Sequence, residues 1–361
     1  MTDNSTAISP NSPPVQADLQ ATLSAIRTNC HITDARHATD YTMCVYLMKM
    51  REYYRWEQGL PFSAHLPKQA VGDWLSAREQ RWDDLAEAEY AELDIAGVRY
   101  DPFDAEGINR ALAPMGLVYS GGLGRGGKAH FFLAELERSQ ELDGFAVYVA
   151  GRELARDLAA PPAMMREDRV FVRRESLRRW LWEKLESWRW SRPDNALGRA
   201  FACYDFEGQL EPSLERMTDT ELEMVLLHEI GEFYAGVALG DGWNRMLLAF
   251  AHTPLELMLR AVRDHLADCL STLPGLLERE RPESLHFYVG NLSHMRRELF
   301  PSLEAAYRAW LESRDPEPLR DLARRGREHW EGLAGQLLAL WERRGTDALG
   351  PAQGLVRSRY L

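Results

Sequence analysis

Histidine and carboxylate residues gather at two places where the chain is expected to be helical. In the first, CHITDARHATD, the residues His31, Asp34, His37 and Asp40 recur at every third position. Residues three apart are neighbours on a helix, so Asp34 and His37 share one surface patch, toward which His31 could fold back. Neutral imidazole and carboxylate are usual ligands of zinc, iron and manganese. We therefore predict His31, Asp34 and His37 as metal ligands.

The second place is the sequence ELEMVLLHEIGEFYAG, residues 221–236. Glu221, His228 and Glu232 fall on one helical stripe, and His228 and Glu232, one turn apart, could bind a single ion. Glu and His facing the inside of a helical bundle build carboxylate-bridged metal sites. The motif H-E-x-x-E resembles the zinc-protease helix but lacks its second His, so the protease function does not carry over. The step of seven residues from Glu to His resembles one helix of haem-oxygenase-like di-iron proteins.

Each place also has an ordinary structural interpretation. The first could be an acidic helix start whose polar residues meet solvent. The second could be the solvent side of an amphipathic helix whose apolar face holds Leu226, Ile230, Phe233 and Val237. A further group on a later helix could supply a missing ligand; it comprises Asp264, His265, Asp268 and Cys269.

Three arginines near the first place are candidates for binding a substrate. Arg36, Arg51 and Arg55 could clamp an acidic group, because guanidinium pairs well with carboxylate. The glycine-rich run GGLGRGGK, residues 121–128, lacks the residue order of a phosphate-binding loop and does not open a helix. We expect it to be a hairpin loop.

Composition limits the classes of partner and the compartment. The 361 residues carry a net charge of -12, which disfavours binding to nucleic acid or to anionic membranes. There is no apolar run of about 18 residues and no signal peptide, so no membrane segment is expected. The four cysteines are scattered, as is typical of a reducing compartment. We predict a cytoplasmic protein.

The elements that must position these residues form a mainly α protein: a helical bundle with a small α+β insertion, an antiparallel sheet, in its middle. The predicted parts are a disordered tail (1–15), N-terminal bundle helices (16–94), the α+β insertion (95–173), the C-terminal helical part (174–344) and a second tail (345–361). Thr33 is expected to cap the second helix. Apolar residues on every face from Tyr41 to Tyr54 predict a central helix packed on several sides.

Two segments resemble those of an uncharacterised bacterial family of conserved hypothetical proteins. They are CHITDARHATDYTMCVYLMKMREYYRWE and LHEIGEFYAG. The resemblance implies a bacterial origin and transfers no site and no activity.

Three functions remain open, of which one is a metal-free enzyme or small-ligand binder in which Arg36, Arg51 or Arg55 clamps an acidic group. The other two differ in chemistry. The first is a metal-dependent helical enzyme in which both polar stripes meet around iron, manganese or zinc and act, oxidatively or hydrolytically, on a small molecule. The alternative is a non-catalytic interaction or assembly protein that uses its amphipathic helices to bind a protein partner.

Overall fold

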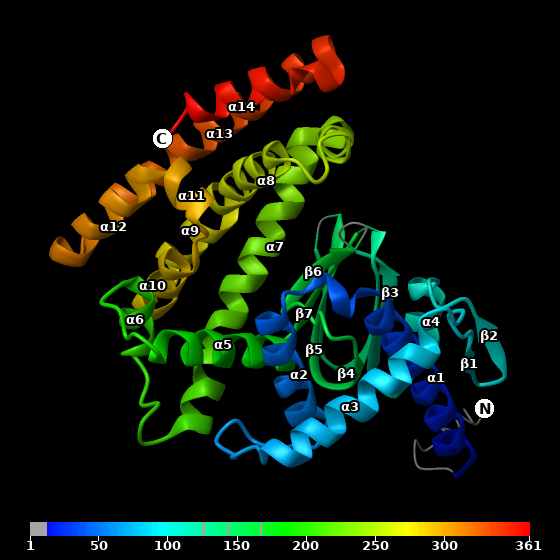
Figure 1. The fold of residues 1–361 in the computed structure, drawn as a ribbon. Helices are drawn as coiled ribbons and strands as arrows, with labels where there is room; N and C mark the ends of the chain where they lie inside the picture. Colours follow the sequence, from blue (N-terminus) through cyan, green and yellow to red (C-terminus); the bar gives the residue numbers. More distant parts are fainter. Residues whose placement is uncertain (1–12, 125–126, 143, 167) are drawn as a thin grey trace, which may run out of the picture. The chain divides into compact units, whose positions relative to one another are not determined.

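The computed structural model describes residues 13–361 except 125–126, 143 and 167. Residues 1–12 of the tail predicted over 1–15 lie outside the described residues, and helix begins at Pro13. The chain forms two compact units (Figure 1). The N-terminal unit holds the described residues up to Pro162 together with Arg166–Trp180, and the C-terminal unit holds Ala163–Met165 and Leu181–Leu361. The N-terminal helices therefore share a unit with the sheet.

Three helices open the N-terminal unit: α1 (Pro13–His37), α2 (Met43–Glu57) and α3 (Lys68–Leu85). The predicted helix start at Thr33 is wrong, because α1 continues through it to His37. The helical spacing of Leu23, Ile26 and Cys30 explains this, since all three pack into one core with the sheet and no breaking residue follows them.

The second part of this unit is a β-sheet with more strands than expected. A short hairpin pairs β1 (Leu93–Ile95) with β2 (Val98–Tyr100), and α4 (Ala105–Leu112) follows, capped by the Asp104 carboxylate. The main sheet has the order β3-β4-β5-β7-β6. Its strands are β3 (Leu117–Leu123), β4 (Ala129–Leu142), β5 (Phe145–Arg156), β6 (Ala163–Arg166) and β7 (Arg169–Arg173).

The prediction of a small antiparallel sheet needs correction, because this sheet has five strands and is mixed. β3, β4 and β5 form an antiparallel meander, whereas β5 and β7 run parallel. The chain passes through β6 between β5 and β7, so β7 can return in the direction of β5 without a crossover helix. The mainly helical fold class is confirmed.

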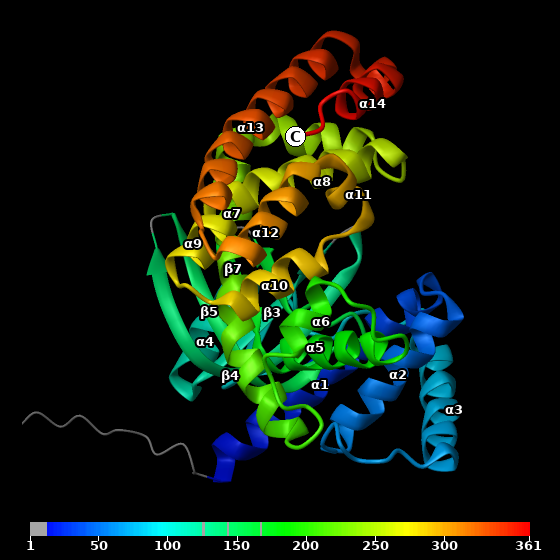
Figure 2. The same ribbon diagram turned by 90° about the vertical axis from the view of Figure 1, so that its left-hand side faces the viewer.

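Helix α5 (Arg174–Arg189) passes from the first unit into the second. The C-terminal unit then contains α6 (Ala196–Phe201), α7 (Leu210–Ala249), α8 (Pro254–Ala267), a π-helical turn (Asp268–Thr272), α9 (Leu273–Glu278), α10 (Pro282–Asn291), α11 (His294–Leu299), α12 (Pro301–Ser313), α13 (Glu317–Arg344) and α14 (Leu349–Arg357). Helix α13 packs along α7 and α8 (Figures 1 and 2).

Two local expectations differ from the structure. The irregular tail predicted after Gly345 is wrong, because this segment forms a short 3₁₀ turn and α14, whose residues Ala348, Ala352 and Val356 are buried at helical spacing. The central position predicted for α2 is also wrong for its first half, where four apolar side chains are exposed: Met43, Val45, Leu47 and Met48. The core contacts of α2 come mainly from its second half, where Met50 and Tyr53 are buried, whereas Tyr46 in the first half is only partly buried against the same core.

Of the helices that the structure describes, none is long and apolar enough to cross a membrane. The cytoplasmic location stays a prediction.

Candidate functional site

The predicted ligands in the N-terminal unit do not share one patch. His31 is buried beside Arg78, whose Nη1 lies 3.1 Å from its Nε2. Burial, and then the charge of Arg78, lower the pKa of His31 to about 3, so this imidazole stays neutral next to a cation. Asp34 is buried on α1 and accepts the N–H of Leu158 at 2.7 Å. His37 ends the helix and pairs instead with Asp40 at 3.2 Å.

The three arginines predicted to bind a substrate have partners within the fold. Arg36 donates to the carbonyl oxygens of Ala86 and Ala88 at the end of α3. Arg51 and Arg55 both donate to the Glu52 carboxylate, at 2.7 and 3.0 Å. These contacts hold α1 against α3 and fix α2, so a substrate would have to displace an existing interaction.

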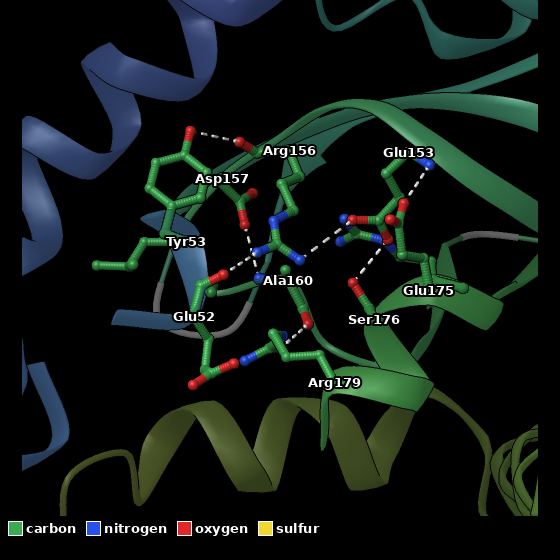
Figure 3. Close-up of polar contacts among 12 residues, drawn as sticks. Glu52, Tyr53, Glu153, Arg156, Asp157, Ala160, Glu175, Ser176 and Arg179 are labelled. Carbon is green, nitrogen blue, oxygen red and sulfur yellow. Dashed lines mark hydrogen bonds and ion pairs between the residues drawn. The ribbon is translucent and has the colours of Figure 1, made fainter. Parts of the chain in front are cut away.

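A network of buried charges lies deeper in this unit, where the sheet meets α2 and α5 (Figure 3). The Glu153 side chain on β5 has no exposed area, and it accepts Arg173 Nε at 2.8 Å and Ser176 Oγ at 2.6 Å. Burial alone would raise the pKa of Glu153, but Arg173 and then Arg156 outweigh it and hold the pKa below its ordinary value. Glu153 is therefore a charged carboxylate inside the protein.

The same network ties the end of β5 to two helices. The Arg156 guanidinium lies 4.5 Å from the Trp56 ring centroid, and its main-chain carbonyl accepts the Tyr53 hydroxyl at 3.1 Å. From α5, Arg179 donates to the Ala160 carbonyl at 2.6 Å (Figure 3). Because Glu153, Arg156 and Arg179 are all buried, the network serves the fold and offers a solute no entry.

In the C-terminal unit, the predicted polar stripe of α7 faces inward. Glu221 is wholly buried and accepts the Ser284 hydroxyl at 3.2 Å. His228 and Glu232 are about a quarter exposed, whereas the apolar Val237 is 67% exposed. The interpretation of this stripe as a plain solvent face is therefore wrong.

The best candidate for chemistry is the pair formed by His228 and Asp268. His228 Nδ1 donates to Asp268 Oδ1 at 2.9 Å, and its Nε2 lies 3.6 Å from Glu232 Oε1. Burial alone would lower the pKa of His228, but Asp268 and then Glu232 outweigh it and raise the pKa to about 9. The ring is thus charged at neutral pH and about a quarter exposed, with a buried carboxylate behind it.

Asp268 is held by residues from α10, from α11 and from its own π-helical turn. Its Oδ2 accepts the Tyr288 hydroxyl at 2.8 Å and also pairs with Arg296, and its Oδ1 accepts Thr272 Oγ1 at 3.0 Å. Burial alone would raise the pKa of Asp268, but Arg296 and then His228 hold it well below its ordinary value. The sequence marks Asp268 only as a possible ligand, and it gives no signal for Tyr288 or Arg296.

Further charged groups surround the exposed edge of the imidazole. Glu232 pairs with Arg263 at 2.8 Å, and Arg263 lies 3.6 Å from Asp264. Burial, and then the charge of Glu232, raise the pKa of Glu229 to about 7. Five half-buried residues and the buried Asp268 thus lie together, and we name them the α7–α8 cluster. Its members are His228, Glu229, Glu232, Arg263, Asp264 and Asp268.

Two local features bring the halves of this cluster together. A Cβ on Gly231 would lie 2.3 Å from the Ala267 carbonyl oxygen, so only glycine lets α7 approach α8 this closely. Asp268 then opens a π-helical turn, and Pro274, which has no N–H to continue the α-helical ladder, follows it. Such turns are often found at functional sites.

The structure offers no ready metal site. In the part of the chain that it describes, no group of three or more His, Cys, Asp or Glu side chains is placed to hold an ion. The predicted ligands divide between the two units, with His31, Asp34 and His37 in the first and Glu221, His228 and Glu232 in the second. Arg263 and Arg296 already supply positive charge to the α7–α8 cluster. The iron, manganese or zinc ion stays a prediction.

Comparison with known families accounts for nearly the whole chain. Residues 21–173 match the N-terminal domain of a family of unknown function (DUF6866), and residues 178–359 match its C-terminal domain. The junction falls in α5, close to the boundary between the compact units. The predicted resemblance to a family without known function is confirmed, whereas the bacterial origin stays a prediction. Neither the curated proteins nor the solved structures gave a match.

Proposed function

This chain belongs to the DUF6866 family, and we propose that it is an enzyme whose α7–α8 cluster moves protons to and from a small molecule. The observation that carries the proposal is the His228–Asp268 pair. A fully buried, multiply bonded aspartate orients an imidazole that is itself about a quarter exposed. General acids and bases are held in this way by a third group while one nitrogen faces the substrate.

The pKa values in the cluster suit an acid and a base. With a pKa of about 9, His228 keeps its proton at neutral pH and can donate it. With a pKa of about 7, Glu229 is partly ionised at neutral pH and can accept one. An environment that shifts the pKa values of two neighbouring groups lets one act as the acid and the other as the base in a single site. The rate should rise as Glu229 loses its proton near pH 7 and fall as His228 loses its proton near pH 9.

Proton transfer fits this arrangement better than chemistry at a metal ion. The two carboxylates that pair with the imidazole each have a cationic partner, since Arg263 pairs with Glu232 and Arg296 pairs with Asp268. A divalent ion at the same place would have to break these ion pairs and displace the proton of His228. The small-molecule substrate is a prediction, and its chemical class is open.

A metabolite screen tests the proposal for a substrate of any chemical class. Purified protein would be incubated with a mixture of cellular metabolites, and the products would be followed by mass spectrometry. His228→Gln should convert these compounds at least about 100-fold more slowly than the wild-type protein does. The matched control is His294→Gln, because the His294 side chain is 95% exposed. Equal conversion by a folded His228→Gln protein, or none by the wild type, would contradict the proposal.

A second candidate function, assembly with another copy of the chain, is favoured by one observation on α2. The exposed fractions there are 69% for Met43, 40% for Val45, 46% for Leu47 and 48% for Met48, in a segment without charged residues. Unpaired apolar surface of this kind marks contact sites. In sedimentation, the wild type should associate with rising concentration and Met43→Ser/Leu47→Ser should not, with Val98→Ser as the control. A wild type that stays monomeric would exclude this function.

A further inference from the structure

A pocket in the C-terminal unit lies apart from the α7–α8 cluster. It encloses about 310 Å³ between α9, α10 and the end of α12. Ligand pockets of proteins have volumes from about 300 Å³ upward. The apolar part of the lining is formed by Leu276, Leu277, Leu285 and Trp310.

The charged side chains in the lining are mainly cationic. Arg281 and Arg314 line the pocket, and neither side chain has an ion pair or a hydrogen bond with any residue that the structure describes. The Arg314 guanidinium lies 4.9 Å from the Trp310 ring centroid, so its contact with the ring leaves its N–H groups available. Glu280 is the one carboxylate in the lining, and two cations against one anion leave an excess of positive charge.

Two of the charged lining residues stand where helices end. Among the described residues, six that are not glycine have positive φ, and two of them, Glu280 (φ 50°) and Arg314 (φ 60°), line this pocket. Glu280 follows the end of α9 and Arg314 follows the end of α12, where this left-handed conformation commonly ends a helix. The backbone N–H of Arg314 donates to the Trp310 carbonyl at 2.8 Å, which fixes the main chain of Arg314 at the end of α12.

From this lining we infer that the pocket binds a small organic acid: an anionic head group paired with Arg281 and Arg314 and an apolar body on Leu276, Leu277 and Leu285. Arginine is suited to such a head group because its planar guanidinium can bind both oxygens of a carboxylate. The inference does not rest on the acid–base enzyme proposed above, because no residue of the α7–α8 cluster lines the pocket.

Calorimetric titration of the full chain with octanoate tests this site. The wild type should bind octanoate, and Arg281→Met/Arg314→Met should bind it at least about tenfold more weakly, because each lost charge-assisted hydrogen bond weakens binding. The matched control is Arg308→Met/Arg320→Met, whose arginines are exposed on α12 and α13 and lie outside the pocket. All four side chains are on the surface, so both double variants should fold, and thermal melting would verify this.

Two further probes separate the contributions of charge and of apolar contact. Octylamine, with the same tail and the opposite charge, should not bind, and inorganic phosphate should bind more weakly than octanoate. The inference is overturned if octanoate does not bind the wild type up to about 10 mM, or if the arginine double variant binds it equally well. It is also overturned if octylamine or phosphate binds as tightly as octanoate.

Discussion

The N-terminal network around Glu153 and the α7–α8 cluster in the C-terminal unit use the same residue types to different ends. Around Glu153, that carboxylate and the guanidinium groups of Arg156, Arg173 and Arg179 are buried. Around Asp268, the aspartate is buried, but His228, Glu232 and Arg263 are each about a fifth to a quarter exposed. Charges sealed from water fix a fold, whereas charges with one exposed edge can exchange protons with a solute.

Two fully buried glutamates make the comparison sharper. Glu153 has Arg173 at 2.8 Å and Arg156 at 3.8 Å, and it stays charged. Glu221 has the Ser284 hydroxyl as its hydrogen-bond donor, and burial raises its pKa to about 8. The difference shows that burial decides the charge of a carboxylate only where no guanidinium accompanies it.

The largest effect is expected from breaking the sealed network. Glu153→Ala leaves Arg173 buried without its counter-ion, which should lower the free energy of unfolding by about 3–5 kcal/mol. The measurement is urea unfolding at neutral pH. Glu135→Ala on β4 is the control, because its ion pair with Arg152 is exposed and should contribute less than about 1 kcal/mol. Similar losses in the free energy of unfolding for the two variants would show that the buried network contributes no more to stability than an exposed ion pair does.

The next effect concerns the dependence of stability on pH. Glu221 has a raised pKa in the folded state, so its contribution is fully present below about pH 4.5 and is lost as the pH rises through about 8. Between pH 4.5 and pH 7 the wild type should therefore lose about 3 kcal/mol relative to Glu221→Gln. Unfolding measured across this range checks the slope, with Glu223→Gln on the same helix as the control. Parallel curves for wild type and Glu221→Gln would mean that Glu221 is ionised inside the protein.

A smaller effect is expected from forcing α7 and α8 apart. The Cβ introduced by Gly231→Ala would overlap the Ala267 carbonyl, which should lower the free energy of unfolding by about 1–3 kcal/mol. It should also lower the pKa of His228, because the bond to Asp268 lengthens. Gly236→Ala on the same helix is the control, since nothing lies within 4 Å of its Cβ, and it should be neutral or stabilising. If Gly231→Ala behaves like Gly236→Ala, the close approach does not position the pair.

The sequence predicts those features that depend on the residue spacing within a single helix or strand. Helical spacing predicts that Glu221, His228 and Glu232 share a stripe of α7, and short apolar runs between turn signals locate β3, β4, β5 and β7. Such patterns do not say what a stripe faces. His228 on this stripe pairs with Asp268, which is 40 residues away in the sequence.

The rest depends on contacts between distant segments. The parallel pairing of β5 with β7 depends on how the chain returns through β6, and no local signal records it. Arg36 and Arg51 look available in the sequence because the carbonyls of α3 and the Glu52 carboxylate that bind them cannot be read from spacing. Helix α2 looks central because an all-round apolar pattern does not distinguish a core from an exposed surface.

The most direct test of the proposed acid is the pKa of the His228 imidazole, followed by NMR in histidine-labelled protein and assigned with His228→Gln. We predict a pKa of about 9, because Asp268 stabilises the charged ring. In Asp268→Asn the pKa should fall, because Glu232 alone then opposes the effects of burial and of Arg296. A wild-type pKa at or below 6.5 would mean that the buried aspartate does not hold His228 charged, and it would remove the acid from the proposed pair.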